Sequence, residues 1–230
     1  TVSIGAIACG LNGWWKGTEA MKAIDVANPQ VVIADKKRFE RIADLIQHPA
    51  VIVDELNLRD YDHELDSFIR VDEDECACLL YTSGTTGTPK GVMTSHRSMI
   101  ANSTLSMLQG AAVSQDSSAH GIDWSENTPT SLLTSPLFHV SCLSSGIVTS
   151  LFAGSTTLVY EGRFLPEKVL ELITKYNVTS WGGAVPTALK RVLDAAETKN
   201  LNLPSVLVVG GGGAPMPPKL IERTKDVFPN

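Results

Sequence analysis

The chain has 230 residues, of which 43% are hydrophobic, and its formal net charge is −6 at pH 7. This size and composition are typical of a globular protein with one large domain or two small ones and a core of its own. The negative charge argues against nucleic acid or an anionic membrane as the main partner, because both bind clustered lysine and arginine.

The four cysteines form neither a CxxC pair nor a disulfide-dense pattern; they are Cys9, Cys76, Cys78 and Cys142. Cys76 and Cys78 alternate in a strand predicted over 76–81, and we interpret them as small buried residues in a reducing compartment. The apolar stretch 4–15 is short, is interrupted by glycines and lacks a basic leader, so it predicts neither a signal peptide nor a membrane span. These features indicate a cytoplasmic protein.

The first 53 residues alternate predicted helices with short apolar strands. The predicted helices cover 18–26 and 39–46, and the predicted strands cover 31–34 and 51–53. Thr18 is the expected N-cap of the first helix, and Asn28-Pro29 is expected to end it. This alternation predicts βαβ units, a parallel sheet and hence an α/β fold.

Residues 54–75 are rich in aspartate and glutamate. They could form a divalent metal site or a solvated surface linker. We favour the linker because the spacing of the acids fits no metal-binding loop.

A glycine-rich stretch over 79–92, LLYTSGTTGTPKGV, directly follows the predicted strand over 76–81. Glycines let consecutive backbone N–H groups converge on an anion, and the hydroxyls can bind phosphate oxygens or share a metal ion with them. Lys90 adds one mobile positive charge. The residues expected to contribute are Thr82, Ser83, Gly84, Thr85, Thr86, Gly87 and Lys90. The pattern therefore predicts a phosphate-binding loop.

This loop is not a Walker A motif, because Lys90 is followed by Gly91 and Val92 instead of Ser or Thr at the required spacing. Position for position, 79–90 resembles the AMP-binding loop of the adenylate-forming superfamily, which includes acyl-CoA synthetases, adenylation domains and luciferases. The turn Asn-Gly-Trp-Trp at 12–15 is similar to a variant found among fatty-acyl ligases. The resemblance implies layered, mostly parallel sheets with helices on both faces.

After the loop, a helix is predicted over 95–108, and the polar residues 110–130 are expected to be an insertion or loop. Further on, the predicted helices cover 166–176, 187–198 and a segment starting near Pro217 or Pro218. The predicted strands cover 131–135, 155–160, 178–181 and 206–209.

Two aromatic side chains have alternative interpretations. From spacing alone, His139 could be a core histidine, but Pro-Leu-Phe-His-Val resembles the family motif whose histidine lines the acyl pocket. Trp181 could line the acyl tunnel together with the small residues Gly182 and Gly183, or it could be ordinary core. The resemblance favours substrate binding for His139 and leaves Trp181 open.

The strand over 206–209 runs into four glycines and then Ala214-Pro215. This places main chain at the carboxyl edge of a parallel sheet, where such sheets bind ligands. By resemblance, Gly213, Ala214 and Pro215 contact adenine and ribose. This loop and the phosphate loop are thus expected to serve opposite ends of one nucleotide.

The resemblance implies ATP-dependent activation of a carboxylic acid, either fatty or otherwise hydrophobic, to an acyl-adenylate, followed by thioester formation with coenzyme A. Lys90 and His139 are the implied catalytic residues, and Thr82 is an implied ligand of Mg²⁺. The alternatives are an adenylation domain that loads a carrier protein and a non-catalytic nucleotide-binding fragment. A homodimer is left open.

By the same resemblance, residues 1–230 are part of the N-terminal AMP-binding domain, and the C-terminal domain is expected to be absent. Within this region, about 1–75 would supply a first sheet segment and the acidic linker. Residues 76–230 would supply the phosphate loop and the acyl and adenine sites.

Overall fold

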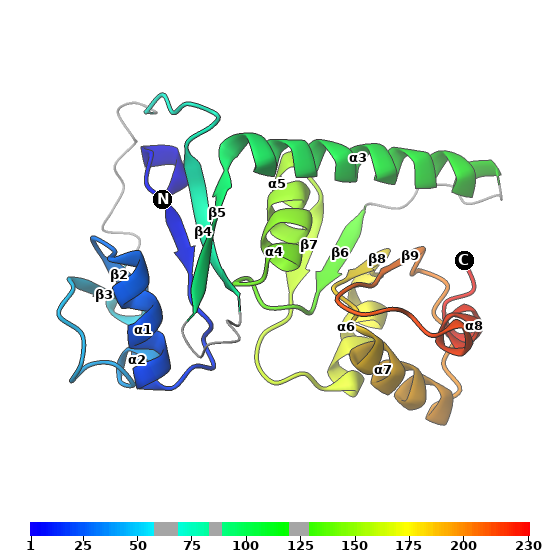
Figure 1. The fold of residues 1–230 in the computed structure, drawn as a ribbon. Helices are drawn as coiled ribbons and strands as arrows, with labels where there is room; N and C mark the ends of the chain where they lie inside the picture. The colour runs from blue at the N-terminus through cyan, green and yellow to red at the C-terminus, as the bar shows by residue number, and fades with distance from the viewer. Residues whose placement is uncertain (58–68, 83–88, 120–128) are drawn as a thin grey trace. The chain divides into compact units, whose positions relative to one another are not determined.

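A computed structural model of the chain describes residues 1–57, 69–82, 89–119 and 129–230. These residues form two compact units, Thr1–Met99 and Ile100–Asn230 (Figure 1). No helix among the described residues is both long enough and apolar enough to cross a membrane.

The first unit contains two small sheets beside helix α1. β1 pairs with β4 in parallel, and β4 pairs with β5 antiparallel, whereas β2 and β3 form a separate parallel pair. Ile24, Val32 and Ile42 form the buried core between α1 and the second sheet. The elements are η1 (Val2–Ile4), β1 (Ala8–Gly10), α1 (Gly17–Ala27), β2 (Val32–Ala34), α2 (Lys36–Phe39), β3 (Ala50–Ile52), η2 (Val53–Glu55), β4 (Cys76–Thr82) and β5 (Lys90–Ser95).

The predicted first helix is present, but its N-cap is Lys16 and not Thr18. The side chain of Glu19 accepts a hydrogen bond from the Lys16 backbone N–H at 2.8 Å. This bond gives the N-cap N–H group a partner at the start of the helix. The predicted end is confirmed: Asn28 adopts the left-handed conformation, with φ of 44°, and donates its N–H to Ile24.

The predicted helix over 39–46 is wrong, because α2 covers only Lys36–Phe39. Asp35 caps this helix by accepting the Arg38 N–H at 2.8 Å, so the helix begins and ends earlier than its apolar spacing predicts. The spacing itself is informative, since Phe39, Ile42 and Ile46 all turn toward the core through tight turns. Apolar periodicity thus identified the side chains that form or pack against the core, but not the backbone conformation.

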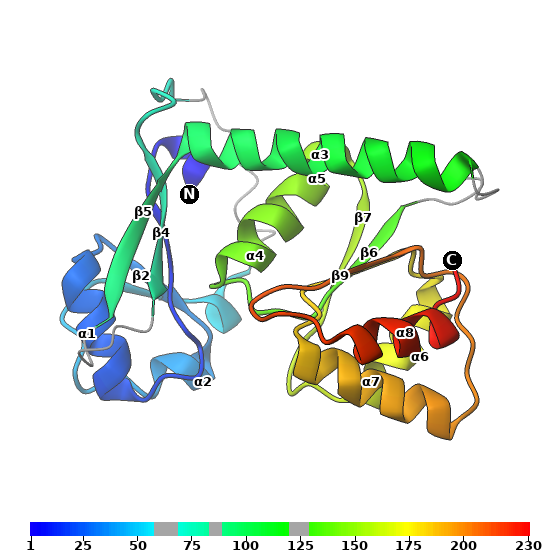
Figure 2. The same ribbon diagram turned by 45° about the vertical axis from the view of Figure 1, so that its right-hand side comes forward.

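The second unit is built on a parallel sheet with strand order β7-β6-β8-β9. Figures 1 and 2 show α6, α7 and α8 along one face, where Leu132, Trp181 and Val206 belong to the main core. On the other face, Gly146 packs against Leu133. The elements are α3 (His96–Ala119, which begins in the first unit), β6 (Thr130–Leu133), α4 (Val140–Cys142), η4 (Leu143–Val148), α5 (Thr149–Ala153), β7 (Thr156–Val159), α6 (Pro166–Tyr176), β8 (Ser180–Gly182), α7 (Pro186–Thr198), β9 (Val208–Gly210) and α8 (Pro218–Val227).

A π-helical segment, η4, lies between α4 and α5. The Thr149 N–H donates to the carbonyl of Ser144, five residues earlier, and the Thr149 hydroxyl donates to the same carbonyl at 3.0 Å. Thr149 Oγ1 also bonds to the fully buried Ser103 of α3 at 3.2 Å. The wide turn is thus held by one threonine that α3 supports.

The expected loop over 110–130 is wrong in its first part, because α3 continues as a helix through Ala119. Polar residues that do not form an apolar stripe can still be helical, and this segment includes the good helix formers Ala111 and Ala112. Residues 120–128 lie outside the described residues. The α/β fold class is confirmed: the sheets are mostly parallel, and the β4–β5 pair is antiparallel.

Candidate active site

The two described ends of the predicted phosphate loop are neighbours on a β-hairpin. Thr82, the last residue of β4, is the cross-strand partner of Lys90, the first residue of β5. Directly opposed residues of antiparallel strands present their side chains on the same face, with Cβ atoms about 4.5–5.5 Å apart. Both residues are exposed. A hydroxyl and a cation therefore flank the loop at the loop end of the hairpin.

Five of the predicted phosphate-binding residues lie outside the described residues: Ser83, Gly84, Thr85, Thr86 and Gly87. The hairpin still shows why a glycine follows Lys90. A Cβ on Gly91 would lie 2.9 Å from Leu79 Cδ2, so a larger residue would displace that side chain. The glycine thus allows the close pairing that sets the loop's ends.

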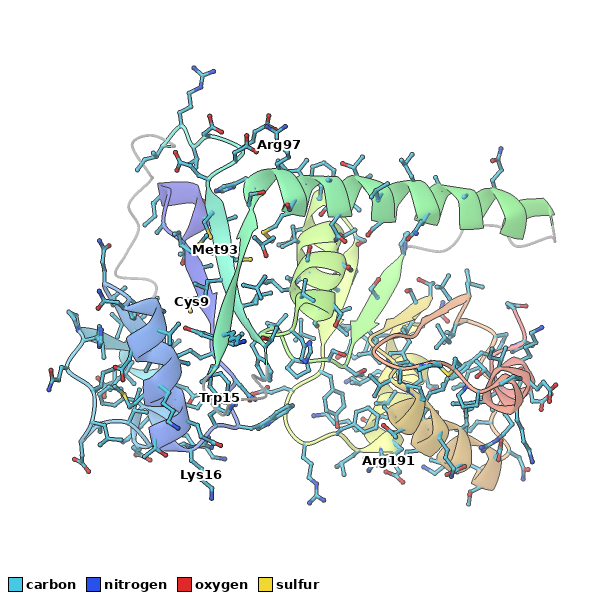
Figure 3. All side chains as sticks on the ribbon, in the orientation of Figure 1. Cys9, Trp15, Lys16, Met93, Arg97 and Arg191 are labelled. Atoms are coloured by element: carbon cyan, nitrogen blue, oxygen red, sulfur yellow. The ribbon has the colours of Figure 1, made fainter. Side chains whose placement is uncertain are left out.

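Tyr81 anchors the loop end of the hairpin to α1. Its hydroxyl donates to the Ala23 carbonyl and accepts the Cys9 thiol at 3.6 Å. Its ring meets Trp15 edge to face with centroids 5.7 Å apart, and Trp15 lies at this end of the strands (Figure 3). Burial raises the pKa of Tyr81 well above its usual range, so the phenol stays neutral and keeps donating to Ala23.

The predicted adenine loop leaves the carboxyl end of β9. Gly213 has φ of 81°, a conformation that favours glycine, and residues 211–215 are exposed. A Cβ on Gly211 would lie 2.7 Å from Met216 Cε, so the backbone there runs close to its neighbours. Gly213, Ala214 and Pro215 therefore offer main chain to a ligand at the sheet edge, just before α8.

His139 is exposed and stands at the start of α4. Its backbone N–H donates to Pro136 at 3.0 Å, and its carbonyl accepts from Leu143 at 2.9 Å. Its ring lies 6.0 Å from the ring of Phe138. Exposure argues against the core-histidine interpretation and leaves the imidazole accessible to a ligand.

Trp181 is fully buried in the core of the second unit. Its indole N–H donates to Thr134 Oγ1 at 3.0 Å, and its ring meets Phe228 at 6.4 Å. In this arrangement a substrate cannot reach the indole, which favours the core interpretation over a place in the tunnel wall. Gly182 and Gly183, the next two residues, are half-buried.

The strand order explains why three of these segments converge. The chain steps from β6 outward to β7 and then returns past β6 to β8 and β9, so the order reverses between β6 and β8. The carboxyl ends of parallel strands at such a reversal form the usual ligand crevice. His139 follows β6, Gly182 ends β8, and Gly213 follows β9, so all three belong to this edge.

Sequence reasoning did not identify Thr134 and Ser135, which lie between β6 and the turn that carries His139. Thr134 accepts from Trp181, and Ser135 Oγ donates to the Gly183 carbonyl at 3.1 Å. The only local signal is a pair of hydroxyl residues ahead of Pro136 at the end of a strand. Their partners lie 47 and 48 positions away, which no local pattern reveals.

Part of the acidic segment is structural. Arg97 binds Asp74 through Nε at 2.7 Å and Glu73 through Nη1 at 2.8 Å, which fixes the approach to β4. Within the described ranges, no group of three histidine, cysteine, aspartate or glutamate side chains could hold a metal ion. Residues 58–68 lie outside those ranges.

The sequence matches the AMP-binding enzyme family over residues 1–230. It is 28% identical over 236 residues to a 4-coumarate–CoA ligase from Pinus taeda, covering 98% of this chain and 42% of the relative. It is 37% identical over 160 residues to 4-coumarate–CoA ligase-like 4 from Oryza sativa subsp. japonica, and this match covers 70% of this chain and 26% of the relative.

Solved structures agree with this match. O-succinylbenzoate coenzyme A synthetase (MenE) from Bacillus subtilis, in complex with AMP, superposes with a TM-score of 0.72 at 27% identity, covering 97% of this chain and 42% of that one. The inhibitor-bound N-terminal domain of FACL13 from Mycobacterium tuberculosis superposes with a TM-score of 0.76 at 27% identity. This match covers 96% of this chain and 54% of that one. This chain spans about 42% of the length of the Pinus taeda relative. The chain belongs to the AMP-binding enzyme family.

Proposed function

We propose that the complete protein joins a hydrophobic carboxylic acid to coenzyme A at the expense of ATP. A carboxylate oxygen attacks the α-phosphorus of ATP, and the bond to pyrophosphate breaks to give an acyl-adenylate. The coenzyme A thiolate then attacks the acyl carbon and AMP leaves. The observation that carries this proposal is the pairing of Thr82 with Lys90 at the ends of a glycine- and hydroxyl-rich loop.

Electrostatics explains why this reaction needs such a loop. Carboxylate and triphosphate repel each other, and negative charge builds on pyrophosphate as it leaves, so catalysis consists mainly of alignment and charge neutralisation. Lys90 supplies a cation, and the hydroxyls of Ser83, Thr85 and Thr86 with the loop amides supply donors. The exposed main chain over 213–215 supports a purine and ribose site at the edge of the second unit's sheet.

Mg²⁺ fits this proposal only through a small contribution from the described residues. Thr82 offers one hydroxyl, and Mg²⁺ is usually held by one or two carboxylates together with phosphates and waters. Thr82 would therefore be one ligand beside the nucleotide's phosphate oxygens. When bound, the ion would neutralise phosphate charge. Lys90 would neutralise charge on the leaving pyrophosphate whether or not the ion is bound.

The acid is proposed to be fatty or otherwise hydrophobic. The small residues Gly182 and Gly183 at the end of β8 and the exposed His139 after β6 lie at the same carboxyl edge of the sheet, which supports an uncharged acyl site there. The names of the relatives refer to 4-coumarate and O-succinylbenzoate, which are aromatic acids, so an aryl acid is the first alternative to a fatty one. The four free cysteines support a reducing, cytoplasmic location.

The test is acid-dependent exchange of labelled pyrophosphate into ATP by the full-length protein, with panels of fatty, aryl and amino acids. Exchange with fatty or aryl acids, followed by AMP release on adding coenzyme A, is the expected result. Exchange that leads to transfer only onto a carrier protein would instead identify the carrier-loading alternative. Calorimetry with ATP and Mg²⁺ on residues 1–230 tests nucleotide binding separately from catalysis, and absence of exchange with every acid would refute the proposed function.

A further inference from the structure

One serine hydroxyl ties together two loops at the carboxyl edge of the β7-β6-β8-β9 sheet. Ser135 Oγ donates to the Gly183 carbonyl at 3.1 Å. Ser135 directly precedes the 136–139 turn that carries His139, and Gly183 begins the turn into α7. The bond therefore joins two segments that the proposed function places beside the acid.

Gly183 is shaped to receive this serine. Its φ of +78° lies in the left-handed region, and a Cβ there would lie 2.3 Å from Ser135 Oγ and 2.9 Å from Ser135 Cβ. The serine side chain thus occupies the space that any other residue at 183 would need. Both the conformation and the close approach require glycine.

The tie begins where the regular sheet ends. The backbone nitrogen of Thr134 is 3.5 Å from the carbonyl oxygen of Gly182, so the hydrogen bond between the two strands is weak at this point. Thr134 is held from below by the buried Trp181 indole at 3.0 Å. Ser135 is the next residue after Thr134. Its hydrogen bond to the Gly183 carbonyl links the two segments beyond the last backbone bond of the sheet.

We propose that Ser135 is a positioning residue that sets the spacing between the His139 turn and the Gly182–Gly183 turn, and hence the width of the acid site. It acts through Gly183 and not by touching the acid. This proposal rests on the proposed function, because it assumes that the acid lies between these turns. The consequence is that loss of the hydroxyl weakens acid binding more than it slows the chemical step.

The kinetic test compares Ser135→Ala with a matched control, Ser155→Ala, in the full-length protein. Ser155 Oγ also donates to a backbone carbonyl in the second unit, that of Ser150 at 3.3 Å, away from the carboxyl edge. A lost hydrogen bond at the site should raise the KM for the acid about 3- to 10-fold, with kcat and the KM for ATP changed by less than about twofold. Ser155→Ala should leave all three unchanged.

A double-mutant cycle distinguishes positioning from general damage. Gly183→Ala alone should raise the KM for the acid, because its Cβ collides with Ser135. In the Ser135→Ala, Gly183→Ala double variant the 2.3 Å contact with the hydroxyl is gone, whereas the left-handed backbone and the 2.9 Å approach to the Cβ at 135 remain, so the two effects should be less than additive without cancelling. Full additivity, or an unchanged KM in Ser135→Ala, would overturn the proposal.

Hydrogen exchange provides a readout that needs no activity. In Ser135→Ala, backbone amides over 137–140 and 182–185 should exchange faster together, whereas those of β9 should keep the wild-type rate. If the wild-type protein proves inactive with every acid, the proposed function fails while this measurement still decides whether the tie exists. Unchanged exchange in both turns would reject the tie itself.

Discussion

Thr82 and Lys90 are cross-strand partners at the loop end of the β4–β5 hairpin. Their pairing means that the strands, and not the loop between them, determine where one hydroxyl and one ammonium group stand. Gly91 lets the strands approach, and Tyr81 fastens this end to α1. A substitution at the hairpin's end should therefore affect phosphate chemistry without unfolding the first unit.

Lys90→Ala tests the charge at this position. We expect acid-dependent pyrophosphate exchange to fall about 10- to 100-fold, because the proposed function assigns this cation to the departing pyrophosphate. Unfolding by urea should be unaltered, since Lys90 is exposed. Lys37→Ala, an exposed lysine on α2, is the matched control and should retain wild-type exchange. Equal losses in both variants would show that Lys90 has no specific role.

Trp181 is expected to contribute mainly to stability. Trp181→Phe removes the indole N–H from Thr134 and part of the buried ring, and should lower the free energy of unfolding by about 1–3 kcal/mol in urea titrations. Thr134→Val should also lower the free energy of unfolding, because it leaves the indole N–H unpaired. The effect should be smaller, because the buried ring stays in place. A stable Trp181→Phe protein with altered acid preference would instead support the tunnel interpretation.

Arg223 joins α8 to α7 through Asp194 and Glu197, with nitrogen–oxygen distances of 2.7 Å. A hydrogen bond from Lys190 and then one from Arg223 lower the pKa of Asp194, and Arg223 lowers that of Glu197. Carboxylates with depressed folded pKa values stabilise the fold above their unfolded pKa values near 4 and lose this as the pH falls through the folded ones.

Arg223→Gln should therefore reduce the melting temperature at pH 7, and the difference from wild type should shrink as the pH is lowered from about 4.5 toward 2.5. Thermal unfolding followed by circular dichroism across this range provides the measurement. A difference that stays constant with pH would mean that Arg223 acts through packing and not through its ion pairs.

Cys142 follows His139 by one helical turn but is only 2% exposed. Burial raises the pKa of its thiol, so little thiolate is present at neutral pH. We expect a thiol-specific reagent to label Cys142 only after unfolding, as followed by mass spectrometry of the peptide that contains it. Rapid labelling in the native protein would show that the α4 turn opens on the time scale of the reaction.

Local signals predicted most of the second unit. Helix α6 was predicted over its observed span, 166–176, from its amphipathic spacing; in the structure Pro166 stands in its first turn, and Asn177, with φ of 49°, ends it in the left-handed conformation. The glycine run before Pro215 likewise predicted exposed main chain at a strand end. In such cases the residues that carry the signal lie within the element itself or directly beside it.

Other features depend on distant partners and could not be predicted from sequence. Trp181 was ambiguous because only the packing of α6, α7 and α8 decides whether it meets core or ligand. The Ser135–Gly183 bond requires the register between β6 and β8. The helix over 39–46 was predicted from spacing, but the cap at Asp35 moved the helical turns toward the N-terminus.

The π-turn held by Thr149 has a consequence for length variation. A π-turn accommodates one more residue than an α-turn over the same rise, so η4 stores a surplus residue inside an otherwise α-helical segment. Deleting one residue within 143–148 should convert the turn to regular α-helix while leaving β7 in register, whereas the same deletion in α6 would rotate every following side chain by about 100°. Within the helical segment from α4 to α5, the π-turn after the histidine turn is therefore the place where the loss of one residue should be tolerated.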